Sequence, residues 1–137
     1  MIVKTASRTL RARETNYLNF LRNYKDEENH KQQHIRQMID SIADPISMVL
    51  EYMEDDLDSL CWRRCLQRAE IKTIARQFLL ALSFIHSRNI VHTDLKPANV
   101  LLSGVTEDGS EYRNITVKLA DFATGESDNL MLGLMCF

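Results

Sequence analysis

Apolar residues between positions 70 and 87 recur with the spacing of one helix face. They fall at i, i+3, i+4, i+7, i+8, i+11 and i+14, which is typical of a long helix whose apolar side packs on a core. The members of this stripe are Ile71, Ile74, Ala75, Phe78, Leu79, Leu82 and Ile85. The pattern predicts a helix over residues 70–87.

Shorter apolar runs rich in β-branched residues predict strands. They lie in residues 1–6, 46–53, 99–102 and 115–123. Leucine and tyrosine side chains at spacings of three and four predict a helix from Arg8 to about Tyr24.

The polar segments between these elements predict connections and boundaries. Residues 25–34 form a charge-mixed connector. In the segment after this connector, residues 35–45, Pro45 ends any helix. The acidic start of residues 54–60 suits a helix N-terminus, where the helix dipole favours negative charge. Residues 103–114, rich in Gly, Glu, Asp and Ser, predict an exposed hairpin or loop.

Composition narrows the class of protein. A chain of 137 residues with 45% hydrophobic residues has material for one core. Its net charge of −2 gives no support to nucleic-acid binding, and its longest apolar run, of 8 residues, is too short for a membrane span. The N-terminus lacks the apolar stretch of a secretory signal, and three cysteines without framework spacing fit a reducing compartment. We expect an intracellular protein, cytoplasmic or nuclear, without nucleic-acid or membrane partners.

The stretch VHTDLKPANVLL, residues 91–102, holds charged and amide side chains between two apolar anchors. Asp94 can accept a proton from a hydroxyl, and Lys96 places a cation two residues further on. Asn99 and the later Asp121 offer the oxygen ligands that Mg²⁺ prefers. Pro97 fixes φ between the lysine and the asparagine and so stiffens the loop. This pattern predicts a rigid loop that positions phosphate, metal and a hydroxyl group.

IVHTDLKPANVLL followed by VKLADFATG resembles the catalytic loop and metal-binding segment of eukaryotic protein kinases, of the Ser/Thr type because of Asp-Leu-Lys-Pro. The resemblance implies that Asp94 is the catalytic base and that Lys96 contacts the γ-phosphate of ATP. It also implies that Asn99 and Asp121 bind Mg²⁺. His92 is expected to be a buried, hydrogen-bonded scaffold residue. The implied cofactors are ATP and Mg²⁺, and the implied partner is a protein substrate.

The resemblance extends toward the N-terminus. IVKTA is similar to the strand that carries the family's phosphate-binding lysine, which implies that role for Lys4. RARETNYLNFL is similar to the helix whose glutamate pairs with this lysine, which implies that Glu14 is the glutamate. SMVLEYM resembles the hinge strand, with Leu50 at the gatekeeper position. The hinge residues implied to line the adenine site through backbone groups are Glu51, Tyr52 and Met53.

The implied fold is α+β, a protein kinase-like two-lobe fold that is incomplete, with a partial small lobe and the first half of the helical large lobe. The implied boundaries are a small lobe and hinge in residues 1–53, a large lobe in 54–125 and a divergent tail in 126–137. The sequence departs from the family pattern at several points. No Gly-rich loop precedes Lys4, and Lys4 and Glu14 are only 10 residues apart. Thr93 replaces an Arg, and Ala123 replaces the Gly after Phe122.

Two functions therefore stay open. The first is an ATP-dependent protein serine/threonine kinase, and the second is a catalytically inactive pseudokinase fragment that binds a nucleotide or a protein. The chain is about half as long as a typical kinase domain, so we expect much of the apolar stripe in residues 70–87 to lack partners within it. An apolar patch of that size indicates either a partner that covers it or a tendency to aggregate.

Three weaker patterns have simpler interpretations. His30 and His34 have a spacing that can bind metal on a helix, but no further ligand completes a site, which favours a solvated connector. Cys61 and Cys65 beside Trp62 favour packing on the following helix over a zinc or redox pair. The carboxylates of EDDLD, residues 54–58, favour a solvated helix start over contact with a nucleotide ribose.

Overall fold

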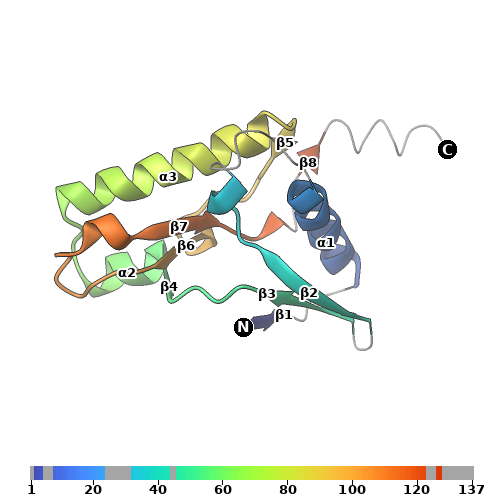
Figure 1. Cartoon of the computed structure of the whole chain (residues 1–137), viewed down its shortest axis with the longest axis horizontal. Helices are drawn as coiled ribbons and strands as arrows, with labels where there is room; N and C mark the ends of the chain where they lie inside the picture. Colours follow the sequence, from blue (N-terminus) through green and yellow to red (C-terminus); the bar gives the residue numbers. More distant parts are fainter. Residues whose placement is uncertain (1, 5–7, 24–31, 44–45, 123–125, 128–137) are drawn as a thin grey trace.

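The computed structural model describes residues 2–4, 8–23, 32–43, 46–122 and 126–127. Two small antiparallel sheets and three helices form most of this part of the chain (Figure 1), in the α+β arrangement that the sequence predicts. No described helix is both long enough and apolar enough to cross a membrane.

The N-terminal sheet has the strand order β1-β3-β2, with both pairs antiparallel. It consists of β1 (Ile2–Lys4), β2 (Met38–Ala43) and β3 (Ile46–Leu50), and α1 (Arg8–Asn23) packs against β2 and β3. The predicted strands near residues 1–6 and 46–53 and the predicted helix from Arg8 are thus confirmed.

The strand β2 is the longest element that the sequence did not reveal. Its pairing with β3 shifts register between Met38 and Asp40. Ile39, within this irregularity, and Ile42, beyond it, are both exposed, with polar residues between them. The alternation of buried and exposed side chains that identifies a strand is therefore missing from this segment.

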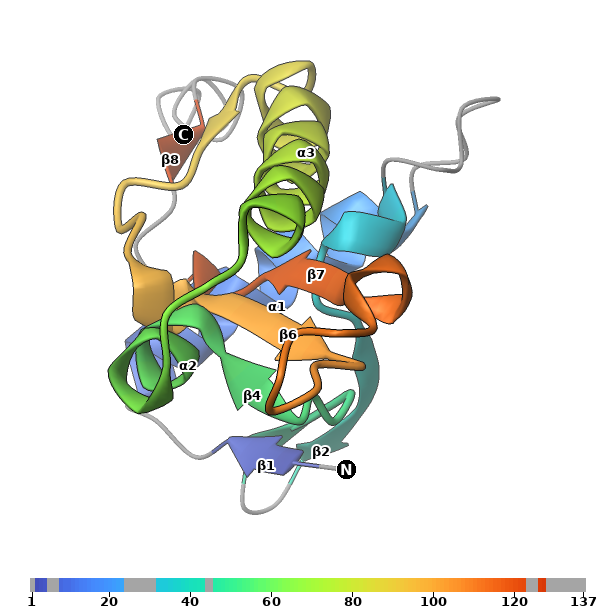
Figure 2. The same cartoon turned by 90° about the vertical axis from the view of Figure 1, so that its left-hand side faces the viewer.

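The second sheet has the order β4-β6-β7 and lies between two helices (Figure 2). Its strands are β4 (Asp55–Asp56), β6 (Val100–Ser103) and β7 (Thr116–Leu119), and its helices are α2 (Leu57–Arg63) and α3 (Arg68–His86). The remaining elements are η1 (Gln32–His34), β5 (Ile90–Val91), η2 (Pro97–Asn99), η3 (Tyr112–Asn114) and β8 (Glu126–Ser127), which pairs with β5.

The predicted helix over residues 70–87 is confirmed as α3, but its buried face differs from the predicted stripe. Ile74 and Ile85 are buried as expected, together with Ala81 and Phe84, whereas Ile71 and Leu79 of the stripe are exposed. The sequence predicted that much of the stripe lacks partners within the chain; Ile71 and Leu79 are exposed, but Phe78 and Leu82 pack against the buried clusters.

Two clusters of buried residues hold the elements together. The larger one connects α1, the N-terminal sheet, α3 and the end of β7, and it includes Leu18, Met48, Phe84, Leu119 and Phe122. The smaller one fills the space between α2, α3 and the hairpin β6–β7. Because Phe122 lies in the larger cluster, the residue before it, Asp121, is anchored to the core.

A buried ion pair fixes the loop that joins β6 to β7. Glu70 is fully buried, and its carboxylate accepts hydrogen bonds from Arg64 at 2.6 and 2.8 Å and from the backbone N–H of Gln67 at 2.8 Å. Arg64 also donates to the carbonyl of Thr106 at 2.7 Å. Gly109 sits on this pair with φ of +70°, and a Cβ there would lie 2.7 Å from Glu70 Oε2. The loop in residues 103–114 was predicted to be exposed, but it is buried where it meets Glu70.

We expect Arg64→Met to lower the free energy of unfolding by about 3 kcal/mol, because it leaves a buried carboxylate without its cation. The matched control is Arg63→Met, which removes the exposed arginine that pairs with Asp55. Because an exposed ion pair contributes little, this control is expected to cost much less. Urea unfolding of both variants measures the difference, and equal losses would contradict the assigned role of Glu70.

His34 lies buried on η1, which packs against α3 and β7, rather than in the solvated connector that the sequence favoured. Its Nδ1 is 3.2 Å from the carbonyl oxygen of Val117. Since a carbonyl only accepts, Nδ1 carries the hydrogen. Burial lowers the pKa of His34 below its ordinary value of 6.5.

Acidification from pH 7.5 to about 5.5 is expected to lower the free energy of unfolding, because the unfolded state, with a histidine pKa near about 6.5, binds a proton more readily than the folded state. His92 contributes with the same sign, since burial also lowers its pKa. His34→Gln keeps an amide donor for Val117 but does not titrate. It should therefore reduce the slope of unfolding free energy against pH, and an unchanged slope would exclude this contribution.

Candidate active site

His92 anchors the loop between β5 and η2. Its side chain is buried, its Nε2 lies 2.8 Å from the carbonyl oxygen of Ala120, and its ring packs against Phe122 at 4.8 Å between centroids. Nε2 therefore carries the hydrogen, and Nδ1 accepts from the N–H of Asp94 at 3.4 Å. The prediction of a buried, hydrogen-bonded scaffold histidine is confirmed.

Ala120 connects this loop to the segment after β7. Its N–H donates to the carbonyl of Asn99 at 3.0 Å, and its own carbonyl accepts from His92. Ala120 therefore fastens Asp121 beside the loop that carries Asp94. Two predicted motifs more than twenty residues apart in the sequence meet at this alanine.

The side chains of Asp94, Lys96 and Asn99 bond to one another. Lys96 Nζ donates to Asp94 Oδ2 at 2.7 Å, and this contact lowers the pKa of the carboxyl and raises that of the ammonium. Asn99 is buried, and its Nδ2 donates to the carbonyl of Asp94 at 2.8 Å and to Oδ2 at 3.2 Å. Both donations fix the orientation of the amide, so that its oxygen is the atom left to accept or to bind a cation.

Backbone strain is concentrated at the same place. Thr93 has φ of 63° and Asp121 has φ of 66°. Left-handed backbone is uncommon outside glycine and especially unfavourable for a β-branched residue. Such conformations persist only where the surrounding structure enforces them, and they cluster at functional sites. Here the enforcing contacts include those of Ala120 and His92.

The donor set fits a hard divalent cation in its chemistry. Asn99 offers an amide oxygen and Asp121 a carboxylate, and the hydrogen bonds of Ala120 bring both residues to one edge. Among the described residues, no three His, Cys, Asp or Glu side chains form a metal site by themselves. A cation held here would therefore need further oxygen ligands, such as phosphate or water.

The residues predicted to hold phosphate come from the N-terminal layer, which consists of α1 and the sheet β1-β3-β2. Lys4 lies in β1, where it pairs with Met48 of β3, but its side chain is outside the described part of the structure. Glu14 lies buried on α1. Arg36, which the sequence did not single out, lies close enough for its charge to interact with Glu14 and Asp121. The pairing of Lys4 with Glu14 stays a prediction.

The hinge after β3 is fixed through Glu51. Its carboxylate accepts from Lys118 Nζ at 2.7 Å on both oxygens and from the N–H of Gln37 at 2.6 Å. Its carbonyl accepts from Arg36 Nε at 3.3 Å and Nη2 at 3.2 Å. The sequence predicted that backbone groups of Glu51 line the adenine site. In the structure the carbonyl of Glu51 already accepts hydrogen bonds from Arg36. The sequence did not single out Lys118, which lies three positions before Asp121.

The remaining hinge residues differ in exposure. Leu50 and Met53 are buried, and Tyr52 is exposed. The acidic residues that follow are engaged locally. Asp56 caps α2 by accepting from the N–H of Ser59 at 2.8 Å, Glu54 accepts from the N–H of Gly104, and Asp55 pairs with Arg63. Asp56 thus caps the helix that the sequence predicted, whereas Asp55 and Asp56 also form the strand β4, which it did not predict.

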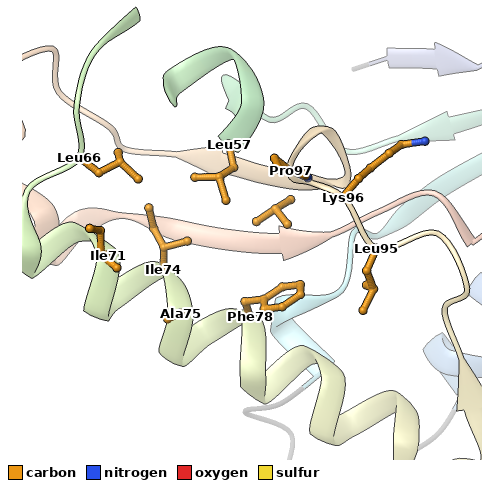
Figure 3. A pocket seen from close by; sticks show the side chains of 10 residues that line it. Leu57, Leu66, Ile71, Ile74, Ala75, Phe78, Leu95, Lys96 and Pro97 are labelled. Carbon is orange, nitrogen blue, oxygen red and sulfur yellow. The ribbon is translucent and has the colours of Figure 1, made fainter. Parts of the chain in front are cut away.

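An apolar groove of about 370 Å³ opens beside the loop, between α2 and α3 (Figure 3). Its lining residues are Leu57, Leu66, Ile71, Ile74, Ala75, Phe78, Leu95, Lys96, Pro97 and Val100. Leu57 and Phe78 face the loop across the groove, whereas the ammonium of Lys96 points away from it. The groove therefore lies against one side of the loop, and the ammonium of Lys96 lies on the other side.

The cysteine pair lies on the surface, and of the histidine pair the structure describes one member. Cys61 and Cys65 are exposed free thiols, so the prediction that they pack on the following helix is wrong. Cys61 lies in the last turn of α2 beside Trp62, which is exposed as well, and Cys65 follows the end of that helix. His34 binds Val117, and His30 lies outside the described residues.

Comparison with known proteins gives a consistent result. The family model for the protein kinase domain matches residues 1–129. The chain is 33% identical to the DNA damage response protein kinase DUN1 of Saccharomyces cerevisiae, over 65% of this chain and 22% of that protein. It is 33% identical to the human serine/threonine-protein kinase ULK1, over 69% of this chain and 9% of that protein, and 41% identical to rat mitogen-activated protein kinase 4, over 55% and 24%. The chain thus spans less than a quarter of the length of each of these relatives.

Lys118→Met is expected to lower the free energy of unfolding by about 2 kcal/mol, because the half-buried carboxylate of Glu51 loses a charged partner. Lys72→Met, on an exposed position of α3, is the matched control and should change little. A double-mutant cycle with Glu51→Gln measures the pair alone and should give a coupling of at least about 0.5 kcal/mol. Strictly additive effects in that cycle would mean that the contact does not hold the hinge.

Proposed function

Because the chain belongs to the protein kinase family, with serine/threonine kinases among its relatives, we propose that it binds ATP with Mg²⁺ and transfers the γ-phosphoryl group to a serine or threonine hydroxyl of a protein substrate. The observation that carries this proposal is the pair of hydrogen bonds of Ala120, which join the loop of Asp94 and Asn99 to Asp121. Phosphoryl transfer depends mainly on positioning and charge neutralisation, and this junction supplies positioning.

The proposed roles follow from the chemistry of each group. Asp94, an anion at neutral pH whose pKa the contact with Lys96 lowers further, orients the acceptor hydroxyl and accepts its proton. Lys96 places its ammonium by the transferred phosphoryl group. Asn99, through its amide oxygen, and Asp121, through its carboxylate, hold the metal. Mg²⁺, when bound, neutralises charge on the phosphate oxygens.

The N-terminal layer has a supporting role in this proposal. Lys4 contacts the phosphates, and Glu14 orients it from α1. The boundary between the two lobes falls at Met53, after the hinge. The protein substrate is unspecified, because nothing in the described surface selects one sequence.

Binding without transfer is the second candidate function. The open groove beside the loop favours it, because Leu95 is exposed where the loop borders the groove. A partner that covers this apolar surface fits a binding module as well as it fits an enzyme.

MgATP is expected to raise the unfolding temperature of the 137-residue chain, since a ligand that binds only the folded state stabilises it by RT ln(1 + [L]/Kd). Asp121→Asn should abolish this shift, because the metal loses a charged ligand. Asp94→Asn should keep the shift but lose phosphoryl transfer to a generic protein substrate. Asp58→Asn, an exposed carboxylate on α2, is the control and should behave as the wild type.

Each outcome of this experiment decides between the candidates. A shift that depends on Asp121 together with transfer that depends on Asp94 supports the kinase. A shift without any transfer favours the binding module, and no shift in the wild type would sink both nucleotide-based roles.

A further inference from the structure

The side-chain amide of Gln77, in the middle of α3, binds the chain at the start of β7 with both of its ends. Nε2 donates to the carbonyl of Ile115 at 2.7 Å, and Oε1 accepts from the N–H of Val117 at 2.9 Å. Both contacts require the same orientation of the amide, with its nitrogen toward Ile115 and its oxygen toward Val117. Gln77 therefore fastens the helix to two alternate residues of one extended segment.

These two backbone groups lie on the outer edge of the hairpin β6–β7. Within the described sheet, the order β4-β6-β7 gives β7 no strand neighbour on the side away from β6. Ile115 and Val117 are nevertheless buried, and a buried backbone group without a partner is costly. Gln77 replaces the missing neighbour here, and the N–H of Arg36 does so at the carbonyl of Leu119.

The contact acts on a strand that leads into strained backbone. Asp121, four residues after Val117, has φ of 66°, a left-handed conformation that persists outside glycine only where the surrounding structure enforces it. Ala120 holds the end of the strand through its bond to Asn99, and Gln77 holds the start. With the start released, β7 can shift relative to α3, and Asp121 can relax toward an ordinary φ, which moves its carboxylate relative to Asn99.

We propose that Gln77 is a positioning residue of the candidate site: it holds β7 against α3 so that Asp121 keeps the backbone conformation in which it can share a metal ion with Asn99. The inference rests on the proposed function, in which these two residues hold Mg²⁺. Gln77 itself touches neither metal nor nucleotide in this arrangement, so its effect reaches the site only through the strand.

The test compares ATP binding to the 137-residue chain in EDTA and in excess Mg²⁺. The dissociation constant in EDTA divided by that in Mg²⁺ measures what the metal contributes to binding. In Gln77→Met, which keeps a side chain of similar length, this ratio should fall by about fivefold or more, the factor for one strained residue that relaxes. A smaller folded fraction raises both dissociation constants equally, so a purely structural loss leaves the ratio unchanged.

Gln67→Met is the matched control. Gln67, at the N-cap of α3, also donates from its amide nitrogen to a backbone carbonyl, that of Asp108 at 2.7 Å. This contact lies in the loop between β6 and β7 rather than on the strand, so its loss should leave the ratio at the wild-type value. An equal fall in both variants would mean that any loosening of α3 lowers the ratio, and would overturn the assignment to Gln77.

Hydrogen exchange in the unmodified chain tests the same coupling in the opposite direction. If the Gln77 contact favours metal binding, metal binding must favour the contact by the same factor. Mg²⁺ added to the ATP complex should therefore slow exchange of the Val117 N–H by about fivefold relative to that of the Gln67 N–H, which is bound to Glu70. This measurement decides alone if Gln77→Met does not fold, and an unchanged relative rate would overturn the inference.

The outcomes separate this inference from the function on which it rests. A wild type that binds ATP more tightly with Mg²⁺, together with a folded Gln77→Met variant of the same ratio, keeps the metal site and overturns the role of Gln77. A wild type that binds ATP equally well with Mg²⁺ and with EDTA, or does not bind it at all, removes the proposed function and the inference together.

Discussion

The candidate site depends on how Ala120 satisfies its two buried backbone groups. Its N–H and carbonyl find their partners in Asn99 and His92, on either side of the loop that carries Asp94. A buried backbone group without a partner is costly, so these bonds strongly favour one position of the loop. The register of the hairpin, in which Val100 pairs with Leu119, places Ala120 at this point. A slip of one residue would turn Asp121 to the opposite face and separate it from Asn99.

The strand β7 extends this role to the rest of the molecule. Successive residues from Val117 to Ala120 each bind a different segment of the chain. The carbonyl of Val117 accepts from His34, the ammonium of Lys118 donates to Glu51, and the carbonyl of Leu119 accepts from the N–H of Arg36. Backbone and side-chain groups leave a strand in different directions, so one short strand can contact the N-terminal layer, the hinge and the loop at once. The geometry of the site and the attachment of the N-terminal layer are therefore consequences of the same four residues.

Local patterns predicted the elements whose side chains follow a regular period. The helix α3, the hairpin strands and the motif around Asp94 were found because their spacing is intact. The strand β2 was missed because its register shift removes the alternation, and the buried face of α3 was misjudged because exposed Ile71 and Leu79 have the same period as buried Ile74 and Ile85. Contacts such as Arg36 with Glu51 depend on a meeting of distant segments, which no local period contains.

The pairing of Asp94 with Lys96 bears on how the proposed transfer proceeds. A general base works best when its pKa is near the pH of the reaction, yet the ammonium of Lys96 lowers the pKa of Asp94 further below it. Such a carboxylate is a weak base, so its main contribution is to orient the hydroxyl rather than to remove its proton early. A dissociative transition state requires little nucleophilic push, and deprotonation can follow the formation of the new P–O bond. The rigidity that Ala120 and His92 impose on the loop is therefore more important to this chemistry than the basicity of Asp94.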